Sequence, residues 1–582
     1  MSLKPWRELV SPHRDVLEGI FRQSEFTVDI AAVHRGESTR EYQEAAAFFD
    51  RTFLTEGMRW LITQVALCLT DQGGEPVIQI QSPPGGGKTH SLLAAYHLIT
   101  RQCPLGELIG IPDLLDSVGG GDVPQARVVV LDGVAHSPTQ HWKHEQRIVR
   151  TLWGEFAWQL GGETAFARVL DADATGTSPS KGILEEFLET YAPCVILLDD
   201  FLSYVQQIPE GQTLSGGSYE SNLSFVQSLA EVVKRVPTTM LVASLPQPRE
   251  GMGQVRELAA LHAMDKVFQR TKSAWRPPFA EELVGIVGCR LFDPVRDPLA
   301  QETVCRAFTK LYEDEAARLP TEIQEGRYLD RLIRTYPLHP EWFDRMSGDW
   351  MTVADFPYLR GMLKCTAQIL FRLWKNNNRD LLILPGSLPL YDACSRDALT
   401  RYLSPGWDVL IHHDIDGDGA VTDTVDHHDP RFGLVNAAHR VARSVFWGSA
   451  PLGASRGLEH TRILLGCLQP GQTASIYLEA LVQWMERTRY LGRSSEKLQD
   501  DTCFWFELPT TLHPVPRQQT PPTFHAPNTR VVSPSATDTS LRATIEIPAA
   551  TIVQLASVLA SDARATVQLT VELSIVPSND PS

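Results

Sequence analysis

Residues 77–92, VIQIQSPPGGGKTHSL, constrain the fold of this chain more than any other stretch. A short apolar run leads into three consecutive glycines, Lys-Thr follows them directly, and a helical pattern begins at Ser91. A strand, a glycine-rich turn and a helix in this order bind phosphate groups, because the glycines let backbone N–H groups turn inward at the positive end of a helix. The stretch therefore predicts an α/β fold with a nucleotide site at the carboxyl end of its first strand.

The residues that close this loop have separate chemical roles. Lys88 brings a positive charge to the β- and γ-phosphates, and the Thr89 hydroxyl is a ligand for Mg²⁺. The whole set that we expect to bind the nucleotide is consecutive: Gly85, Gly86, Gly87, Lys88, Thr89 and His90. ATP with Mg²⁺ is therefore the expected ligand, and a glycine-rich turn before an ordinary helix is the alternative.

One position departs from the usual motif. The place of the leading glycine is taken by Ser82, and Pro83 and Pro84 follow it. Because proline has no backbone N–H, the phosphate cradle has to use the amides of residues 85–89.

A second apolar run ends in two acids. Residues 192–200 read APCVILLDD, which predicts a buried strand followed by an acidic pair. We expect Asp199 to hold Mg²⁺ and Asp200 to orient or deprotonate the attacking water. The usual residue at the second position is Glu, and Asp is one methylene shorter, which leaves efficient hydrolysis open. A buried strand with an acidic turn is the alternative.

Further apolar runs complete an α/β pattern. Residues 127–132 and 239–246 predict two more strands, with helices near 145–160 and 224–236. Strands that alternate with helices form a parallel sheet, which binds its ligand at the carboxyl ends of the strands. Ser244, near the end of the last run, is our candidate sensor of the γ-phosphate. A serine at the end of an ordinary strand is the alternative.

Two arginines downstream are candidates for completing the site. Arg270 could act as a finger on the nucleotide of a neighbouring subunit, and Arg360 could act as a second sensor. Arg360 lies in a basic and aromatic stretch, residues 359–375, that could also meet nucleic acid. An ordinary solvated or salt-bridged arginine, or a charged helix face, is the alternative.

The length of 582 residues implies several domains. The predicted ranges are 1–70, a helical segment that packs across the sheet edge; 71–300, a P-loop ATPase core; 301–376, a helical lid or winged-helix-like region; 377–507, a mixed α/β region; 508–540, a proline-rich linker; and 541–582, a small β-α-β unit.

Composition narrows the class of protein. Nine scattered cysteines favour reduced thiols in a cytoplasmic protein, and we expect no signal peptide and no membrane span. The net charge of −17 argues against a protein that binds DNA over its whole surface, so any DNA contact needs a local patch. Residues 414–419 begin like a calcium loop but lack the acid at the twelfth position. The histidine pairs at 412–413 and 427–428 are poorly spaced for zinc.

Several blocks occur in one order across residues 4–507, among them KPWRELVSPH, FFDRTFLTEGMR, GGGKTHSLLAAYHL, YAPCVILLDDF, VASLPQ, YPLHPEWFDR and LRGML. With them the chain resembles the prokaryotic AAA+-type ATPases grouped under "domain of unknown function 499". The resemblance implies a P-loop ATPase core with a helical lid and supports the nucleotide-site residues named above. Family members usually carry Asp-Glu where this chain has Asp199 and Asp200. Such genes often lie beside DNA methyltransferases and other parts of anti-phage defence islands.

From these observations we expect an ATP-binding, ATP-hydrolysing AAA+-like motor or switch that serves a DNA-directed or anti-phage defence complex. Two other functions stay open: a non-hydrolysing nucleotide-dependent switch or scaffold, and a DNA translocase-type nucleic-acid-binding module. The expected partners are proteins, by resemblance a DNA methyltransferase or other defence subunits. Contact with DNA is expected to be indirect, and a homo-oligomer is compatible with the sequence.

Overall fold

The computed structural model describes residues 3–24, 26–117, 119, 123–145, 147–247, 255–268, 275–451, 457–495 and 502–508. The chain divides into two units, residues 1–515 and 516–582, and every described residue belongs to the first. Arg270, nearly all of the predicted linker at 508–540 and the predicted β-α-β unit at 541–582 lie outside the described residues.

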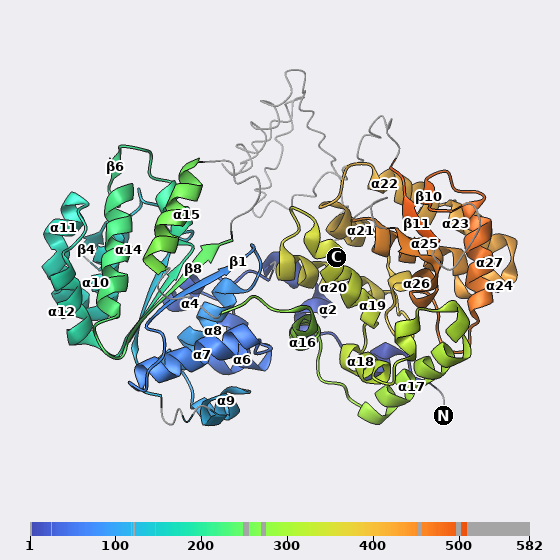
Figure 1. Cartoon of the computed structure of the whole chain (residues 1–582), viewed down its shortest axis with the longest axis horizontal. Coiled ribbons are helices and arrows are strands. Elements are labelled where there is room, and N and C mark those ends of the chain that lie inside the picture. The colour runs from blue at the N-terminus through green and yellow to red at the C-terminus, as the bar shows by residue number, and fades with distance from the viewer. Residues whose placement is uncertain are drawn as a thin grey trace, which may run out of the picture. The chain divides into compact units, whose positions relative to one another are not determined.

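A four-stranded parallel sheet forms the core of the N-terminal half. Its strands, in spatial order, are β1 (Val77–Ser82), β8 (Thr239–Pro246), β5 (Cys194–Asp199) and β2 (Arg127–Asp132). The sequence predicts all four, and the α/β fold with a parallel sheet is confirmed. Because β8 pairs with both β1 and β5, its end lies between the phosphate loop and the acidic pair (Figure 1).

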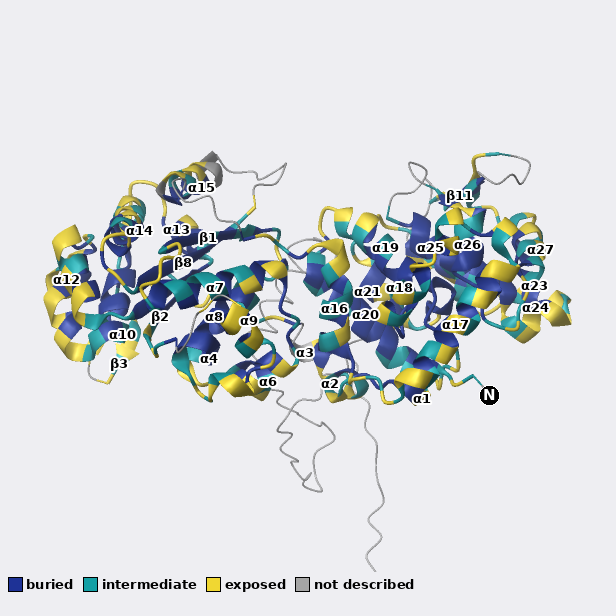
Figure 2. Ribbon diagram, turned by 60° about the horizontal axis from the view of Figure 1, so that its bottom comes forward, coloured by how far each residue is buried: buried dark blue, intermediate teal, exposed yellow. Residues whose placement is uncertain are grey.

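Helices cover both faces of the sheet, because most positions of its strands are apolar. One face packs against α4 (Ile30–Arg35), α6 (Ala45–Asp50), α7 (Glu56–Leu69) and α8 (Lys88–Thr100). The other packs against α10 (Leu152–Phe166), α12 (Lys181–Tyr191), α13 (Phe201–Gln206) and α14 (Tyr219–Val233). The apolar strand residues therefore alternate between two hydrophobic clusters, and most residues of the four strands are buried (Figure 2).

A helical body with its own hydrophobic cluster follows the sheet. Its first helices are α16 (Ala280–Leu291), α17 (Pro298–Asp314), α18 (Tyr328–Thr335), α19 (Pro340–Gly348) and α20 (Tyr358–Lys375). The later ones are α21 (Ala393–Thr400), α22 (Trp407–Leu410), α23 (Val421–His428), α24 (Pro430–Val435), α25 (Ala437–Ser449), α26 (His460–Leu465) and α27 (Ala474–Met485). A small antiparallel sheet has the order β10 (Leu491–Arg493), β11 (Cys503–Phe506) and β9 (Leu458–Glu459).

The N-terminal helices divide between the two parts of this unit. The helices α1 (Trp6–Leu9), α2 (Arg14–Glu18) and α3 (Phe21–Ser24) pack into the helical body, where the rings of Trp6 and Trp374 lie 5.7 Å apart. The helices α4 to α7, including α5 (Arg40–Gln43), pack on a face of the sheet. Residues 1–70 therefore do not pack together across the sheet edge as we expected, because their apolar side chains meet two separate cores.

The segment after β2 also differs from the expectation of a helix near 145–160. The strand β3 (Trp142–His144) pairs antiparallel with β4 (Arg147–Val149), and the Trp142 ring stacks on His136 at 3.5 Å. The helix α10 starts only after Thr151, whose side chain accepts a hydrogen bond from the Gly154 amide at 3.0 Å. Further short elements are α9 (Ile111–Ser117), α11 (Leu170–Thr175), β6 (Thr213–Leu214) and β7 (Gly217–Ser218), and the longer helix α15 (Val255–Phe268) follows β8.

The calcium-like stretch at 414–419 has a structural role. Asp414 accepts a hydrogen bond from the Thr488 hydroxyl at 2.8 Å, and Asp416 pairs with Arg443 at 2.6 Å. Among the described residues, no group of three or more His, Cys, Asp or Glu side chains is arranged to hold a metal ion.

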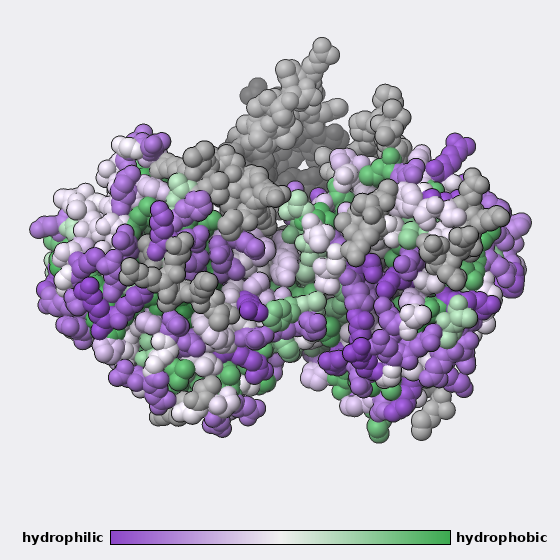
Figure 3. All heavy atoms as spheres, viewed as in Figure 1, coloured by the Kyte–Doolittle hydropathy of each residue, from purple (hydrophilic) through white to green (hydrophobic). Residues whose placement is uncertain are grey.

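The helices of the described part of the chain are all too short or too polar to cross a bilayer. On the face shown in Figure 3, hydrophilic residues predominate and apolar residues lie among them in small groups.

Candidate nucleotide-binding site

The phosphate loop joins the end of β1 to the start of α8. The helix begins at Lys88, directly after the glycines, so the unpaired amides of its first turn belong to the loop. Gly85 and Gly87 have φ angles of 79° and 89°, in the left-handed region that glycine enters without strain. The Ser91 hydroxyl donates to the Gly87 carbonyl at 2.9 Å. The strand, loop and helix predicted for residues 77–92 are confirmed.

The Ser82 carbonyl connects the loop to the end of β8. It accepts hydrogen bonds from the Lys88 ammonium and from the Gln247 amide, both at 3.2 Å. Ser82 is fully buried, and its hydroxyl donates to the Pro83 carbonyl at 3.1 Å. The unusual first residue of the loop is therefore part of its internal bonding.

The acidic pair follows β5. Asp199 is the last residue of that strand and is 2 % exposed, and Asp200 caps α13 with a left-handed φ of 43°. Aspartate enters this backbone region more readily than most residues, because its short polar side chain bonds locally. The Ser244 hydroxyl donates to Asp199 Oδ1 and accepts from the Asp200 amide at 3.0 Å. β8 thus holds both acids in place.

Burial raises the pKa of the Asp199 carboxyl to about 7, and the Asp200 carboxylate acts in the same direction. Hydrogen bonds from the hydroxyls of Ser244 and Thr89 oppose the rise. A buried carboxylate beside a second carboxylate and a threonine hydroxyl is a donor set that suits a hard divalent cation. The two predicted Mg²⁺ ligands, Thr89 and Asp199, therefore lie within hydrogen-bonding reach of each other.

Two further carboxylates stand at the same edge of the sheet. Asp132 ends β2 opposite Asp199, and its side chain accepts from the amides of Val134 and Ala135 at 2.8 and 3.0 Å. Burial raises the pKa of Asp132, and the carboxylate of Asp29 adds to the rise. Both acids line the cavity described next. We assigned them no role from the sequence, although Asp132 ends its strand as Asp199 does.

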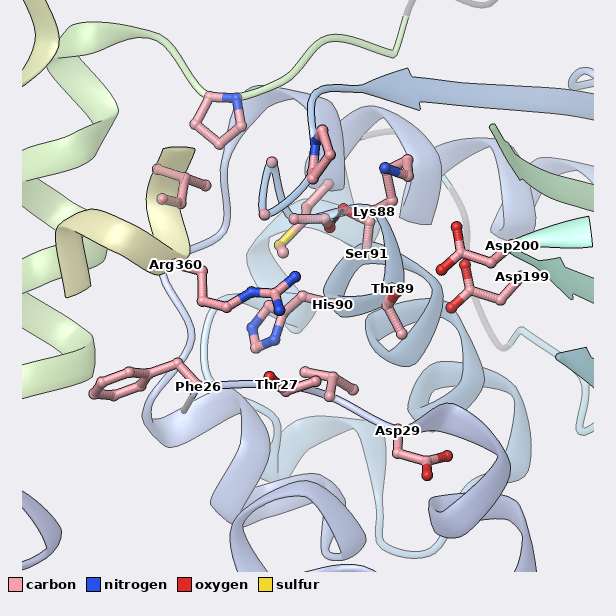
Figure 4. Close-up of a pocket in the computed structure, with 18 of the residues that line it drawn as sticks. Phe26, Thr27, Asp29, Lys88, Thr89, His90, Ser91, Asp199, Asp200 and Arg360 are labelled. Atoms are coloured by element: carbon pink, nitrogen blue, oxygen red, sulfur yellow. Dashed lines mark hydrogen bonds between the residues drawn. The ribbon is translucent and has the colours of Figure 1, made fainter. Parts of the chain in front are cut away.

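The loop and the acids open into one cavity of about 760 Å³. Lys88, Thr89, Asp199 and Asp200 line it, and Arg360 enters it from α20 (Figure 4). Arg360 extends toward the start of α8, and Thr89 points toward the acidic pair (Figure 4). Arg360 has no ion pair or hydrogen bond with any described residue. Its charge is therefore available to an anionic ligand.

A second part of the cavity wall is apolar. It is formed by Phe26, Val28, Phe53, Met58, Trp275, Pro278, Ile286, Leu359 and Leu363. These side chains come from the N-terminal segment, from α7, from α16 and residues 275–279 before it, and from α20. No local pattern marks them as one group, so sequence reasoning did not find them. An apolar wall next to a phosphate-binding loop suits a nucleotide base.

The helical body touches the phosphate loop directly. A Cβ atom on Gly85 would lie 2.3 Å from the carbonyl oxygen of Pro357, and one on Gly87 would lie 3.8 Å from Leu359 Cδ1. The start of α20, which carries Arg360, therefore packs on the loop and leaves no room for a side chain at Gly85.

Two predicted site residues have other contacts. Ser244 holds the acidic pair and does not line the cavity, whereas Gln247, just after β8, does. His90 lines the cavity, but its Nε2 pairs with the Thr52 hydroxyl at 3.0 Å, and burial lowers the pKa of its ring to about 3. His90 therefore connects α8 to the N-terminal helices through this hydrogen bond. The third candidate, Arg270, lies outside the described residues.

Comparison with known proteins agrees with the resemblance noted from the sequence. Residues 8–273 match the family model described as the DUF499 N-terminal domain, a match that covers less than half of the chain. No curated protein matches the chain. Among solved structures, the Aeropyrum pernix ORC1 protein in complex with DNA is 13% identical, with 78% of this chain and 90% of that chain covered and a TM-score of 0.28. At that TM-score the likeness carries no argument about this chain.

Proposed function

We propose that this protein binds ATP with Mg²⁺ and hydrolyses it as an AAA+-like motor or switch. One observation carries the proposal: Lys88, Asp199, Asp200 and Arg360 come from separate elements and line the same cavity (Figure 4). A lysine at a helix N-terminus, an acidic pair and an arginine are the groups that phosphoryl transfer requires, since its transition state is stabilised by charge and position.

Thr89 and Asp199 are the residues that would hold Mg²⁺. When bound, the ion would neutralise phosphate charge and orient the reacting group. Asp199 is the residue that best supports a magnesium site here. Because burial raises the pKa of its carboxyl, a nearby cation would stabilise the charged form. Lys88 and the amides of residues 85–89 would bind the β- and γ-phosphates, with the base against the apolar wall.

Asp200 would orient or deprotonate the attacking water, and Arg360 would stabilise the charge that develops on the transferred phosphate. The Asp200 backbone is held from both sides: its amide donates to Ser244, and a Cβ atom on Gly133 would lie 2.3 Å from its carbonyl oxygen. A fixed backbone keeps the short Asp200 side chain in one position. General base catalysis needs this, because the base has to lie within hydrogen-bonding reach of the water.

Variants of Lys88 and Asp200 test the proposal. Lys88→Ala should abolish ATP binding, whereas Asp200→Asn should keep it and slow phosphate release by about 10²-fold or more. Asparagine tolerates the left-handed backbone of this position as aspartate does. The second variant therefore measures the effect of losing the carboxylate charge alone. Binding is measured by calorimetry, and phosphate release is measured with Mg²⁺ and after its chelation.

Asp418→Asn, an exposed change away from the cavity, is the control for loss of charge and should leave both readouts unchanged. Turnover at the wild-type rate by Lys88→Ala would overturn the assignment.

A non-hydrolysing nucleotide switch is the second candidate, and Asp200 is the observation that favours it. Its side chain is one methylene shorter than the glutamate usual at this position, so it reaches less far from the end of β5. Binding of ATP without phosphate release, both with and without DNA, would select the switch over the ATPase.

The wider role is proposed from the family match alone. We propose service in a DNA-directed or anti-phage defence complex in the cytoplasm, with a DNA methyltransferase or another defence subunit as partner. A homo-oligomer that forms with ATP is part of the same proposal. Light scattering of the purified protein with and without ATP tests the assembly, and co-purification of products of neighbouring genes tests the partner.

A further inference from the structure

The end of α20 that lies away from the nucleotide cavity is the strongest feature that the proposed ATP site does not use, and it continues one side of this helix. This side carries Arg360, Lys364, Gln368, Phe371 and Lys375 at spacings of three and four residues. The Arg360 end enters the nucleotide cavity. The Lys375 end lies about 22 Å further along the helix axis, where α1 and α3 pack.

At that second end, cations lie over aromatic rings. The Arg7 guanidinium lies 4.4 Å from the centre of the Trp374 ring, and the Arg22 guanidinium lies 4.6 Å from that of Phe371. The Lys375 ammonium also faces Phe371, at 5.6 Å. Each ring attracts a cation without neutralising it. The aromatic residues of the stretch 359–375 therefore collect positive charge from two separate parts of the chain.

The hydrogen-bond partners of these cations are neutral as well. Arg7 donates to the Asn377 side chain, and Arg22 donates to Gln368 at 2.9 Å. Arg379 is exposed in the loop that follows α20, and the backbone of that loop holds α1 through the Trp6 amide. We call Arg7, Arg22, Lys375 and Arg379 the α20 basic patch. None of the four has an ion pair with a described acid.

Other cations near α1 and α20, unlike those of the α20 basic patch, form ion pairs with acids. Lys4 pairs with Asp297 at 3.0 Å, Arg14 with Glu18 at 2.7 Å and Arg372 with Asp392 at 3.5 Å. Glu8 on α1 is exposed and is not paired with any described cation. The patch therefore keeps an excess of positive charge on a chain whose net charge is −17.

We infer that the α20 basic patch binds the sugar-phosphate backbone of duplex DNA without reading its sequence. Phosphates are the ligand that several unneutralised Arg and Lys side chains favour, because binding releases counterions from the polyanion. A cation already lies over each of the Trp374 and Phe371 rings, so these rings offer less open surface for the stacking that single-stranded bases need. The inference goes beyond the proposed ATPase activity and does not depend on it.

The test measures binding of a short, mixed-sequence DNA duplex to the full chain without nucleotide. With up to four phosphate contacts, log K should fall with log salt with a slope of about −3 to −4. The variant Lys375→Glu with Arg379→Glu should weaken binding about tenfold or more at about 50 mM salt and roughly halve the slope. Both positions are exposed, so the fold should be kept.

Lys310→Glu is the matched control, since Lys310 is an exposed lysine on α17 without a described partner. It should change the affinity by less than about twofold. Undetectable duplex binding by the wild type at low salt would overturn the inference, as would equal loss in the control. Equal binding of polyglutamate would overturn it in favour of acidic proteins, and tighter binding of a single strand would exclude the duplex geometry. Lys88→Ala should bind the duplex as the wild type does, which separates this inference from the ATP site.

Discussion

Ser82 and Gly86 share one space in the phosphate loop. A Cβ atom on Gly86 would lie 2.4 Å from Ser82 Oγ and 2.8 Å from Ser82 Cβ, closer than real side chains approach. The loop thus accepts a serine where a glycine is usual, because residue 86 has no side chain. At Asp200 the residue type likewise matches the backbone, since aspartate adopts a left-handed φ more readily than most residues.

The close approach of Ser82 and Gly86 predicts that substitutions at the two positions compensate each other. Gly86→Ala should weaken ATP binding about five- to 100-fold, because overpacking of this kind costs about 1–3 kcal/mol. Ser82→Gly should bind as the wild type does. The double variant should recover most of the loss, but not all of it, since the Pro83 carbonyl also lies 3.0 Å from the new Cβ atom. Calorimetric titration of all four proteins checks this; additive losses would contradict the shared space.

The helix α8 is buried on every side because it lies between the sheet and the N-terminal helices. Residues 91–99 are all buried, and His90 and His97 lie on the face toward Phe48, with ring centres 4.6 and 5.1 Å away. His97 Nε2 pairs with the Tyr42 carbonyl at 2.9 Å. The two histidines thus hold in place the helix whose first turn carries Lys88 and Thr89.

The burial of His97 predicts a dependence of stability on pH. Desolvation lowers its pKa from 6.5 to about 4, partly offset by the Tyr42 carbonyl. Between these values the unfolded chain binds the extra proton, so the stability is fully present above about pH 6.5 and is lost as pH falls toward about 4. Between about pH 7.5 and pH 5.5, the wild type should lose about 1.4 kcal/mol more than His97→Gln. Urea unfolding at both pH values measures this, and parallel losses in the two proteins would refute it.

A partly buried ion network joins the sheet region to the helical body. Arg290 on α16 pairs with Glu41 at 2.7 Å and with Asp15 at 3.4 Å. Arg51 bridges the same two acids at 3.3 and 3.0 Å and donates to the Arg290 carbonyl at 2.8 Å. Arg290 and Arg51 also line the nucleotide cavity. The cavity wall and the junction between the two hydrophobic clusters are therefore made partly of the same residues.

Breaking this network should be costly. Arg290→Met leaves Glu41 and Asp15 with Arg51 as their described cationic partner, and losing the hydrogen bonds that the buried Arg290 makes to charged groups should cost about 2–3 kcal/mol. Arg306→Met removes an exposed arginine from its pair with Glu302 and should cost less than about 1 kcal/mol. Denaturant unfolding of both variants compares the two costs. A loss for Arg290→Met no larger than that of the control would show that the network does not hold the junction.

Prediction from the sequence succeeded where the signal is local. The four strands, the glycine loop and the acids at 199 and 200 follow from apolar runs and from residue types with narrow backbone preferences. It failed at residues 147–149, which form β4 and pair with β3, whereas we expected a helix near 145–160. The sensor role of Ser244 stays a prediction, and only the structure shows that its buried hydroxyl bonds to Asp199 and to the Asp200 amide.

The sequence by itself determined the glycine loop between β1 and α8 and the order of the sheet's strands, since these depend on neighbours along the chain. Only the tertiary structure decided which distant residues complete the site. Arg360, Asp29, Asp132 and the apolar wall reach the cavity through packing of elements up to several hundred residues apart. The same holds for the division of the N-terminal helices between two cores. Burial and shape complementarity select such contacts, and neither is written in the local order of residues.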